Sequence, residues 1–362
     1  MKAKPQSKIK IATYAICKNE AKHVKRWLEA TKESDVRVIL DTGSTDNTME
    51  LLSEATNLIV GTTVVSPWRF DTARNQALAL VPKDVDVCLI LDMDEVPEKN
   101  FYRKVQNQWV RGADRGWVSL DTGFAWKVDR LHSRHGWTWK WPCHEALVRE
   151  DGKEEYTYCD TTTIIRHQPD VTKSRGQYET MLEDAVKEMP EDARMWTYLC
   201  REYYFHEKWE KVIESAEQVL KKDGMDHELA AVCRWAGDAA RALKRPSKEW
   251  FEKGVSLCPD QGESWLGMAS DALRRGDYGL ALDSAIRCFE LPKVVHYLHE
   301  PSAWNWKAYD IAAQAAFHLG ELDAAIAFAQ EAFRGKGPES DRIKRNIQMM
   351  VGIKNGSKKT KV

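Results

Sequence analysis

Short apolar runs separated by polar turns characterise the chain up to about residue 170. These runs are rich in Val, Ile and Leu, and they occupy residues 8–16, 36–40, 58–65 and 86–91. Runs that are apolar along most of their length are typical of strands covered on both faces. Segments with helix start signals lie between them, at residues 20–31, 46–55 and 71–80. The alternation predicts a mostly parallel sheet with helices on its faces.

From about residue 175 onward, Ala, Glu, Leu, Lys and Trp dominate, and strand-like runs disappear. Trp196 and Trp265 begin similar patterns 69 residues apart, which is two periods of about 34 residues. The segment 226–259 fits this pattern least well, and an insertion at 294–306 interrupts it. The period resembles that of tetratricopeptide repeats, so we expect three to four helix pairs over residues 190–335.

The chain has 362 residues, too many for one ordinary core, and we predict two domains and a tail. These are an α/β domain over 1–172, an all-α repeat domain over 173–340 and a basic polar tail over 341–362. A formal net charge of −1 argues against binding of polyanions by the chain as a whole. Eight cysteines without a CxxC pair predict buried free thiols in a reducing compartment. With no apolar stretch near the roughly 18 residues of a membrane span and no signal-peptide cleavage site, we expect a soluble cytoplasmic protein.

Acidic residues follow the strand predicted at 86–91, in the sequence LDMDE. Ligands of open α/β sheets bind beyond the carboxyl ends of the strands. In an extended chain, Asp92 and Asp94 would point to the same side. Two converging carboxylates suit Mg²⁺ or Mn²⁺, with diphosphate oxygens completing the coordination. An acidic turn that only ends a strand is the alternative, because short motifs recur by chance.

Polar residues also follow the other three predicted strands, in the motifs KNE, DTGSTDNT and F-x-x-ARN. Asp41 could accept hydrogen bonds from a base or a ribose, and the turn amides after it favour anionic ligands. A well-capped turn between strand and helix would explain the same residues without a ligand. Four successive strands that bring polar groups to one edge are nevertheless what a nucleotide site requires.

In this order, the four motifs resemble family 2 glycosyltransferases, which have the Rossmann-like GT-A fold. More narrowly, the chain is similar to members that carry tetratricopeptide repeats after the catalytic domain. The resemblance covers about residues 1–170 by motif and 190–335 by architecture. It implies inverting transfer of a sugar from a nucleotide-diphosphate sugar, with a UDP-sugar as the expected donor and Mn²⁺ or Mg²⁺ as the metal.

The resemblance also implies roles for six side chains near the donor. The nucleoside would contact Glu20 and Asp41, the metal and diphosphate would contact Asp92 and Asp94, and Arg74 and Asn75 would support the pocket.

The aromatic segment WTWKWPCHE provides our first candidate for a general base, Glu145. Inverting transfer needs a base that deprotonates the acceptor as it attacks. Glu95 and Asp121 are competing candidates, and an ordinary surface carboxylate is the alternative for Glu145. Relatives usually have a Gly where this chain has Pro142 or Cys143, so the local turn is expected to differ.

Two histidines are candidates for further metal ligands, His144 and His167. Imidazole completes many metal sites that also contain carboxylates, and the metal would stabilise charge on the departing phosphate. A structural histidine that ligates nothing is the alternative at both positions.

Residues 127–141 are both basic and aromatic. They predict either a mobile loop that neutralises the donor diphosphate or a surface that contacts nucleic acid. We expect a protein or peptide acceptor that docks on the repeats. Sugar transfer to a modified base in DNA and a non-catalytic repeat scaffold are the alternatives, and exposed repeat faces are compatible with a homo-oligomer. An enzyme that synthesises nucleotide sugars is disfavoured, because KNE stands where a Gly-rich phosphate loop would be.

Overall fold

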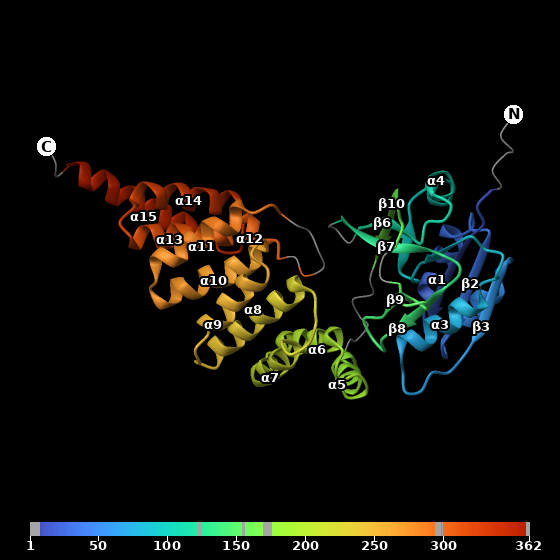
Figure 1. The fold of residues 1–362 in the computed structure, drawn as a ribbon. Coiled ribbons are helices and arrows are strands. Elements are labelled where there is room, and N and C mark those ends of the chain that lie inside the picture. The colour runs from blue at the N-terminus through green and yellow to red at the C-terminus, as the bar shows by residue number, and fades with distance from the viewer. Residues whose placement is uncertain are drawn as a thin grey trace, which may run out of the picture. The chain divides into compact units, whose positions relative to one another are not determined.

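The computed structural model describes residues 8–121, 125–153, 156–168, 176–293, 298 and 300–359. Contacts divide the chain into two compact units, Met1–Met181 and Leu182–Val362. Figure 1 shows strands in the first unit and helices alone in the second, as the sequence predicts. The predicted boundary between residues 172 and 173 lies outside the described residues.

An eight-stranded sheet with the order β3-β2-β1-β4-β7-β6-β10-β5 forms the centre of the first unit. Its strands are β1 (Ile11–Cys17), β2 (Val36–Asp41), β3 (Leu58–Thr62), β4 (Val87–Ile90), β5 (Glu95–Pro97), β6 (Arg115–Asp121), β7 (Ala125–Ser133) and β10 (Tyr158–His167). β8 (Trp137–Lys140) and β9 (Ala146–Arg149) form a separate two-stranded sheet. The pairs β1–β2, β2–β3, β1–β4 and β6–β10 are parallel. The predicted mostly parallel sheet is therefore confirmed.

Helices cover both faces of this sheet because alternate side chains of its strands enter two different cores. The helices are α1 (Ala21–Ala30), α2 (Thr48–Ser53), α3 (Phe70–Leu80) and α4 (Phe101–Gln108). Ile11 of β1 is fully buried in a core that also contains Trp27 of α1. Tyr14 of β1 is fully buried in the opposite core, which contains Leu78 of α3. The carboxyl ends of β1, β2 and β4 consequently stay open for a ligand.

Residues 127–141 form strands in place of the predicted mobile loop. They lie in β7, which pairs with β4 and β6, and in β8, which pairs with β9. Their basic side chains have partners inside the domain: Lys127 contacts Asp160, Arg130 contacts Glu95, and Arg134 donates to the Val81 carbonyl. The mobile-loop interpretation was wrong because antiparallel partners, β4 and β6 for β7 and β9 for β8, supply the hydrogen bonds of most of this segment.

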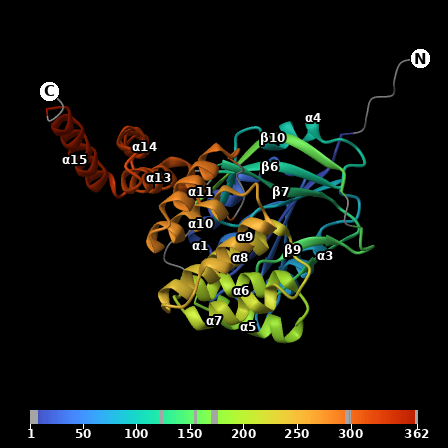
Figure 2. The same cartoon turned by 60° about the vertical axis from the view of Figure 1, so that its left-hand side comes forward.

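The second unit consists of paired helices that stack along the chain (Figure 2). Its described helices are α5 (Tyr178–Glu188, which begins in the first unit), α6 (Ala193–Phe205), α7 (Trp209–Val219), α8 (Asp226–Ala242), α9 (Lys248–Leu257), α10 (Gly262–Arg275), α11 (Tyr278–Glu290), α12 (Ser302–Asn305), α13 (Lys307–His318), α14 (Leu322–Arg334) and α15 (Ser340–Lys359). The pairs α6–α7, α8–α9, α10–α11 and α13–α14 confirm the predicted repeats. The segment 226–259 also forms a pair. Gly237 is required there, because a Cβ atom would lie 2.6 Å from the Phe251 ring.

The described part of the predicted basic polar tail over 341–362 forms helix α15. Ile343 and Met350 are buried against the preceding repeat helices. Ile347, which lies between them in the sequence, packs against the same hydrophobic cluster. The spacing of four and three residues places all three on one helix face. Residues 360–362 lie outside the described residues.

All eight cysteines lie among the described residues and are free thiols, seven of them buried and Cys258 half-buried. This agrees with the prediction from their spacing. Of the helices that the structure describes, none combines the length and the apolarity that crossing a bilayer requires.

Candidate active site

A cavity of about 510 Å³ lies beyond the carboxyl ends of β1, β2 and β4. This volume is in the range of small-ligand sites, and its position is where open α/β sheets bind their ligands. Six of the predicted site residues line it: Glu20, Arg74, Asp92, Asp94, Glu145 and His167. Five others do not: Asp41, Asn75, Glu95, Asp121 and His144.

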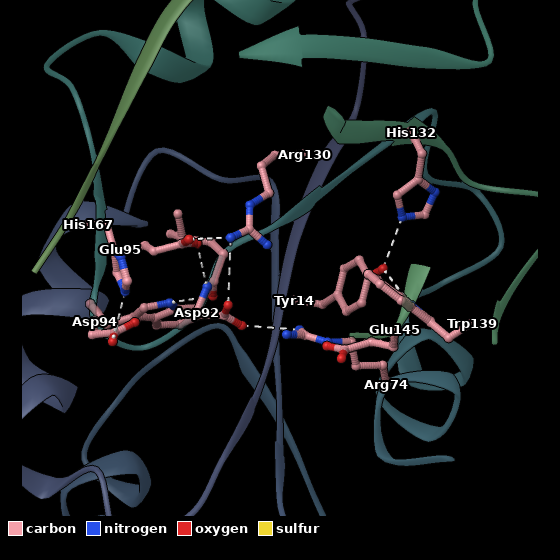
Figure 3. A network of polar contacts seen from close by, with 12 residues as sticks. Tyr14, Arg74, Asp92, Asp94, Glu95, Arg130, His132, Trp139, Glu145 and His167 are labelled. Atoms are coloured by element: carbon pink, nitrogen blue, oxygen red, sulfur yellow. Dashed lines mark hydrogen bonds and ion pairs between the residues drawn. The ribbon is translucent and has the colours of Figure 1, made fainter. Parts of the chain in front are cut away.

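Arg74 connects the predicted base to the predicted metal motif (Figure 3). Its Nε donates to Glu145 Oε1 at 2.6 Å, and its Nη1 donates to Asp92 Oδ1 at 3.1 Å. The guanidinium is buried and lies 5.1 Å from the centre of the Trp139 ring. Burial lowers the pKa of Arg74, but the carboxylates of Asp92 and Glu145 outweigh that effect and raise it. The residue therefore stays a cation that holds two carboxylates from separate segments.

Asp92 lies between two guanidinium groups. Arg130 Nη2 is 3.8 Å from Asp92 Oδ2, whereas Arg74 contacts the other carboxylate oxygen, Oδ1. Burial raises the pKa of Asp92, but Arg74 and Arg130 more than offset this and hold it at about 2. Asp92 is consequently ionised at neutral pH and already has positive partners.

The segment after β4 is a turn, although the sequence analysis assumed an extended chain. The N–H of Glu95 donates to the Asp92 carbonyl at 3.0 Å, which closes the turn. Alternation therefore cannot explain why Asp92 and Asp94 both line the cavity. Met93 between them is buried and anchors the turn in the core below.

Asp94 contacts His167, which is the last residue of β10. Asp94 Oδ2 and His167 Nε2 are 3.2 Å apart, and each side chain is 26% exposed. This hydrogen bond raises the pKa of His167 above its ordinary value. The strand β10 thus brings an imidazole from 73 residues away to the acidic turn.

Among the residues that the structure describes, no group of three or more His, Cys, Asp or Glu side chains is arranged to hold a metal ion. Of the four predicted ligands, only Asp94 and His167 contact one another directly. His144 lies instead against the Tyr178 ring, with ring centres 5.5 Å apart. A metal in this cavity would therefore need oxygens from the ligand, which is usual for Mg²⁺ bound with a diphosphate.

Glu95 and Asp121 are less well placed for proton transfer than Glu145. Glu95 is 1% exposed, pairs with Arg130, and accepts the N–H of Asp92 at 2.9 Å. Burial raises the pKa of Glu95 to about 7, against the opposing effect of Arg130. Asp121 ends β6, where Arg166 is its partner in the sheet register. Only Glu145 of the three candidates lines the cavity.

The KNE and DTGSTDNT motifs are joined by hydrogen bonds between side chains and backbone. Asn19 has a φ of 55°, and its Oδ1 accepts the N–H of Thr45 at 2.7 Å. Asp41 accepts the N–H groups of Gly43 and Ser44, both at 3.0 Å. Burial raises the pKa of Asp41, but the hydrogen bond from the Ser44 hydroxyl, together with these two backbone hydrogen bonds, outweighs it and lowers the pKa. Asp41 therefore shapes the turn beside the cavity, a role that the sequence alone could not separate from ligand binding.

Asn75 holds strand β8 in place by mimicking a strand partner. Its Nδ2 donates to the Trp139 carbonyl at 2.9 Å, and its Oδ1 accepts the Trp139 N–H at 2.8 Å. Asn75 thus supports the pocket indirectly, by fixing the backbone under the ring on which Arg74 lies.

Replacing Asn75 by alanine is expected to destabilise the first domain by about 2–4 kcal/mol, because two buried backbone groups of Trp139 lose their partner. Chemical unfolding measures this change in the free energy of unfolding. The matched control is Asn107→Ala, at an exposed position of α4, which should leave stability nearly unchanged. Equal stability of the two variants would contradict the role of Asn75 in holding strand β8.

Three aromatic side chains form another part of the cavity wall, Trp68, Phe70 and Tyr178. The rings of Phe70 and Tyr178 are stacked at an angle of 22°, with centres 6.2 Å apart, and Trp68 packs edge-on against Phe70. Phe70 begins the predicted motif F-x-x-ARN, but the motif gave no role to Phe70 itself or to Trp68, which precedes the motif. The sequence analysis missed Tyr178, because nothing in the sequence links the start of α5 to the sheet edge.

The segment before Glu145 has an unusual backbone. Trp141 and His144 have φ values of 77° and 50°, in the left-handed region that residues other than glycine rarely adopt. Such conformations cluster at functional sites, where the surrounding structure maintains them. The Phe70 N–H donates to the Pro142 carbonyl at 2.8 Å and ties this turn to α3.

Comparisons with known proteins agree with this division of the chain. Residues 15–171 match the family model described as glycosyl transferase family 2. No curated protein matches the chain at a significant level.

Several solved structures resemble about half of the chain. MamA is 14% identical, with a TM-score of 0.38, over 45% of this chain and 90% of MamA. A thermophilic TPR protein of Thermus thermophilus is 16% identical, with a TM-score of 0.36, over 49% of this chain and 91% of its own. PilW, a type IV pilus biogenesis factor, is 21% identical, with a TM-score of 0.39, over 49% of this chain and 80% of its own.

The α/β fold and the family match cover the same part of the chain, which also contains most of the residues that line the cavity. Residues 15–171 therefore form a glycosyl transferase family 2 domain, and helical repeats of the tetratricopeptide type follow it.

Proposed function

We propose that the chain is a metal-dependent, inverting glycosyltransferase that uses a nucleotide-diphosphate sugar, with a UDP-sugar as the first donor to test. One observation is the main support. A single cavity in the family 2 domain brings together Glu145, Arg74 and the Asp94–His167 pair from four separate segments. Deprotonation of an acceptor requires a base such as a carboxylate, and departure of a diphosphate requires positive charge, from a guanidinium and from a metal cation that the Asp94–His167 pair could bind.

The donor set fits a hard divalent cation that is completed by substrate oxygens. Asp94 and His167 are a quarter exposed and border the cavity, whereas Asp92 is already paired with two guanidinium groups. We therefore assign the metal to Asp94 and His167, and assign Asp92 mainly to the orientation of Arg74 and Arg130. A bound Mn²⁺ or Mg²⁺ would stabilise negative charge on the leaving diphosphate.

Glu145 is the proposed base. It takes the proton of the acceptor hydroxyl while the oxygen forms a bond to the anomeric carbon of the donor. The bond from that carbon to the diphosphate breaks on the opposite face, so the configuration inverts and a nucleoside diphosphate leaves. Arg74 orients Glu145 through a hydrogen bond of 2.6 Å and adds positive charge to the cavity near the departing group.

The aromatic part of the wall supports a substrate that contains flat or ring-shaped groups. Trp68, Phe70 and Tyr178 line the cavity, and aromatic rings suit either a nucleobase or a sugar. The acceptor is proposed to be a protein or peptide, because paired repeat helices present extended surfaces for such partners.

The first experiment is binding of a panel of nucleotides and nucleotide sugars, measured by thermal shift with Mn²⁺ and with a chelator. We expect one diphosphate sugar to stabilise the full chain, by about 2.7 kcal/mol at 100 times its Kd. The shift should disappear with the chelator, because the diphosphate is held through the cation. Folded protein that binds no member of the panel would contradict the transferase function and favour a repeat scaffold.

A further inference from the structure

A buried hydrogen-bond network lies beside Arg74, outside the cavity lining, and contains Tyr14, His132 and Trp139 (Figure 3). Tyr14 is 0% exposed, His132 is 1% exposed and Trp139 is 7% exposed. The Trp139 Nε1–H donates to the Tyr14 hydroxyl at 3.2 Å. The Tyr14 hydroxyl and His132 Nε2 are 3.0 Å apart, and His132 Nδ1 is 2.7 Å from the Ser133 carbonyl.

The chemistry of these groups allows one direction of donation. The Ser133 carbonyl can only accept, so His132 Nδ1 carries the ring proton and donates to it. Nε2 of the neutral ring is then an acceptor, so the Tyr14 hydroxyl donates to Nε2 and its oxygen accepts the indole N–H of Trp139. Burial lowers the pKa of His132 to about 3, so the ring is neutral, as this arrangement requires.

Trp139 links this network to the site. Its ring lies 5.1 Å from the Arg74 guanidinium, and its backbone is fixed by Asn75. With the indole N–H fixed by Tyr14, the ring cannot rotate or tilt without leaving a buried donor unpaired. Arg74 in turn donates to Glu145 at 2.6 Å.

We propose that Tyr14, His132 and Trp139 are positioning residues: their hydrogen-bond chain fixes the Trp139 ring, and through it the Arg74 guanidinium in the orientation that holds Glu145. This inference rests on the proposed transferase function. None of the three touches the reacting atoms, so the chain acts through the geometry of the base.

The test is Tyr14→Phe in the full chain, which removes one hydroxyl and keeps the ring. We expect kcat to fall about tenfold, because a small displacement of a catalytic group is costly. In the Glu145→Gln background the same change should lower kcat by less than about twofold, because the positioned carboxylate is gone. Trp139→Phe keeps a ring beneath Arg74 without the N–H, and it should repeat the result of Tyr14→Phe.

A neighbouring residue provides the matched control. Tyr102 is also buried, and its hydroxyl bonds Thr13 at 2.8 Å, on the opposite face of the sheet from Tyr14. Tyr102→Phe should lower the melting temperature as much as Tyr14→Phe and leave kcat unchanged. The inference would be overturned if Tyr102→Phe lowered kcat as much as Tyr14→Phe does. It would also be overturned if Tyr14→Phe lowered kcat by the same factor in the wild type and in the Glu145→Gln background.

A readout that needs no activity separates this inference from the proposed function. Nitrogen NMR shifts should show His132 as the neutral Nδ1–H tautomer in the wild type, and Tyr14→Phe should change its tautomer population. An Nε2–H tautomer in the wild type would refute the hydrogen-bond chain directly. A wild type that transfers no sugar would refute the transferase function instead, whatever the tautomer.

Discussion

Replacing Asp94 by alanine is expected to abolish metal-dependent donor binding and to lower turnover by on the order of 10³-fold. Asp94 and His167 are the only predicted ligands in direct contact among the described residues, so the change leaves a single protein ligand. The proposed cation prefers oxygen ligands, so the imidazole of His167 alone would bind it only weakly. Isothermal titration of the donor with and without Mn²⁺, together with steady-state kinetics, measures both effects.

The fold should survive this substitution. Asp94 is 26% exposed, and a partly exposed pair with a histidine contributes about 0–1 kcal/mol. The control is Asp160→Ala, an exposed carboxylate on the same strand as His167, paired with Lys127. It should bind the donor like the wild type. If Asp94→Ala still binds the donor in a manganese-dependent way and with the wild-type Kd, Asp94 is not a metal ligand.

The parallel half of the domain could be predicted from sequence, because each of its strands is a continuous apolar run followed by a polar turn. The cavity edge followed from the rule that carboxyl ends of parallel strands adjoin one site. The strands after residue 110 were not predicted in detail. They pair largely antiparallel, β7 with β4 and β6 and β8 with β9, and the basic residues of β7 and β8 conceal their apolar pattern.

Six of the eleven candidate site residues line the cavity, but the contacts that each of them makes could not be predicted from the sequence. The pattern placed Asp41 at the carboxyl end of β2, yet it could not show that Asp41 and Asn75 both bond the backbone. It could not show that Arg74 pairs with Glu145, because this contact joins residues 71 positions apart. Tyr178 had no sequence signal at all. Side-chain direction depends on the packed turn around each residue, and a one-dimensional pattern does not contain that information.

Replacing Glu145 by glutamine is expected to lower kcat about 100-fold and to leave donor affinity nearly unchanged, as for the loss of a general base. The amide oxygen can still accept the hydrogen bond from Arg74, so the cavity keeps its shape, but an amide cannot take a proton at neutral pH. Steady-state kinetics give kcat, and titration gives the donor Kd.

Three further variants make the assignment of the base specific. Glu150→Gln, an exposed carboxylate five residues along the chain, should leave both constants unchanged. Asp121→Asn should have little effect on kcat, because Asp121 does not line the cavity. Glu95→Gln removes a buried partner of Arg130 and should mainly lower stability, since breaking a buried pair leaves an uncompensated charge. Glu145 is not the base if kcat is unchanged in Glu145→Gln and falls 100-fold in Asp121→Asn or in folded Glu95→Gln. The carboxylate whose replacement lowers kcat would then be the general base, and Glu145 would only hold Arg74 in place.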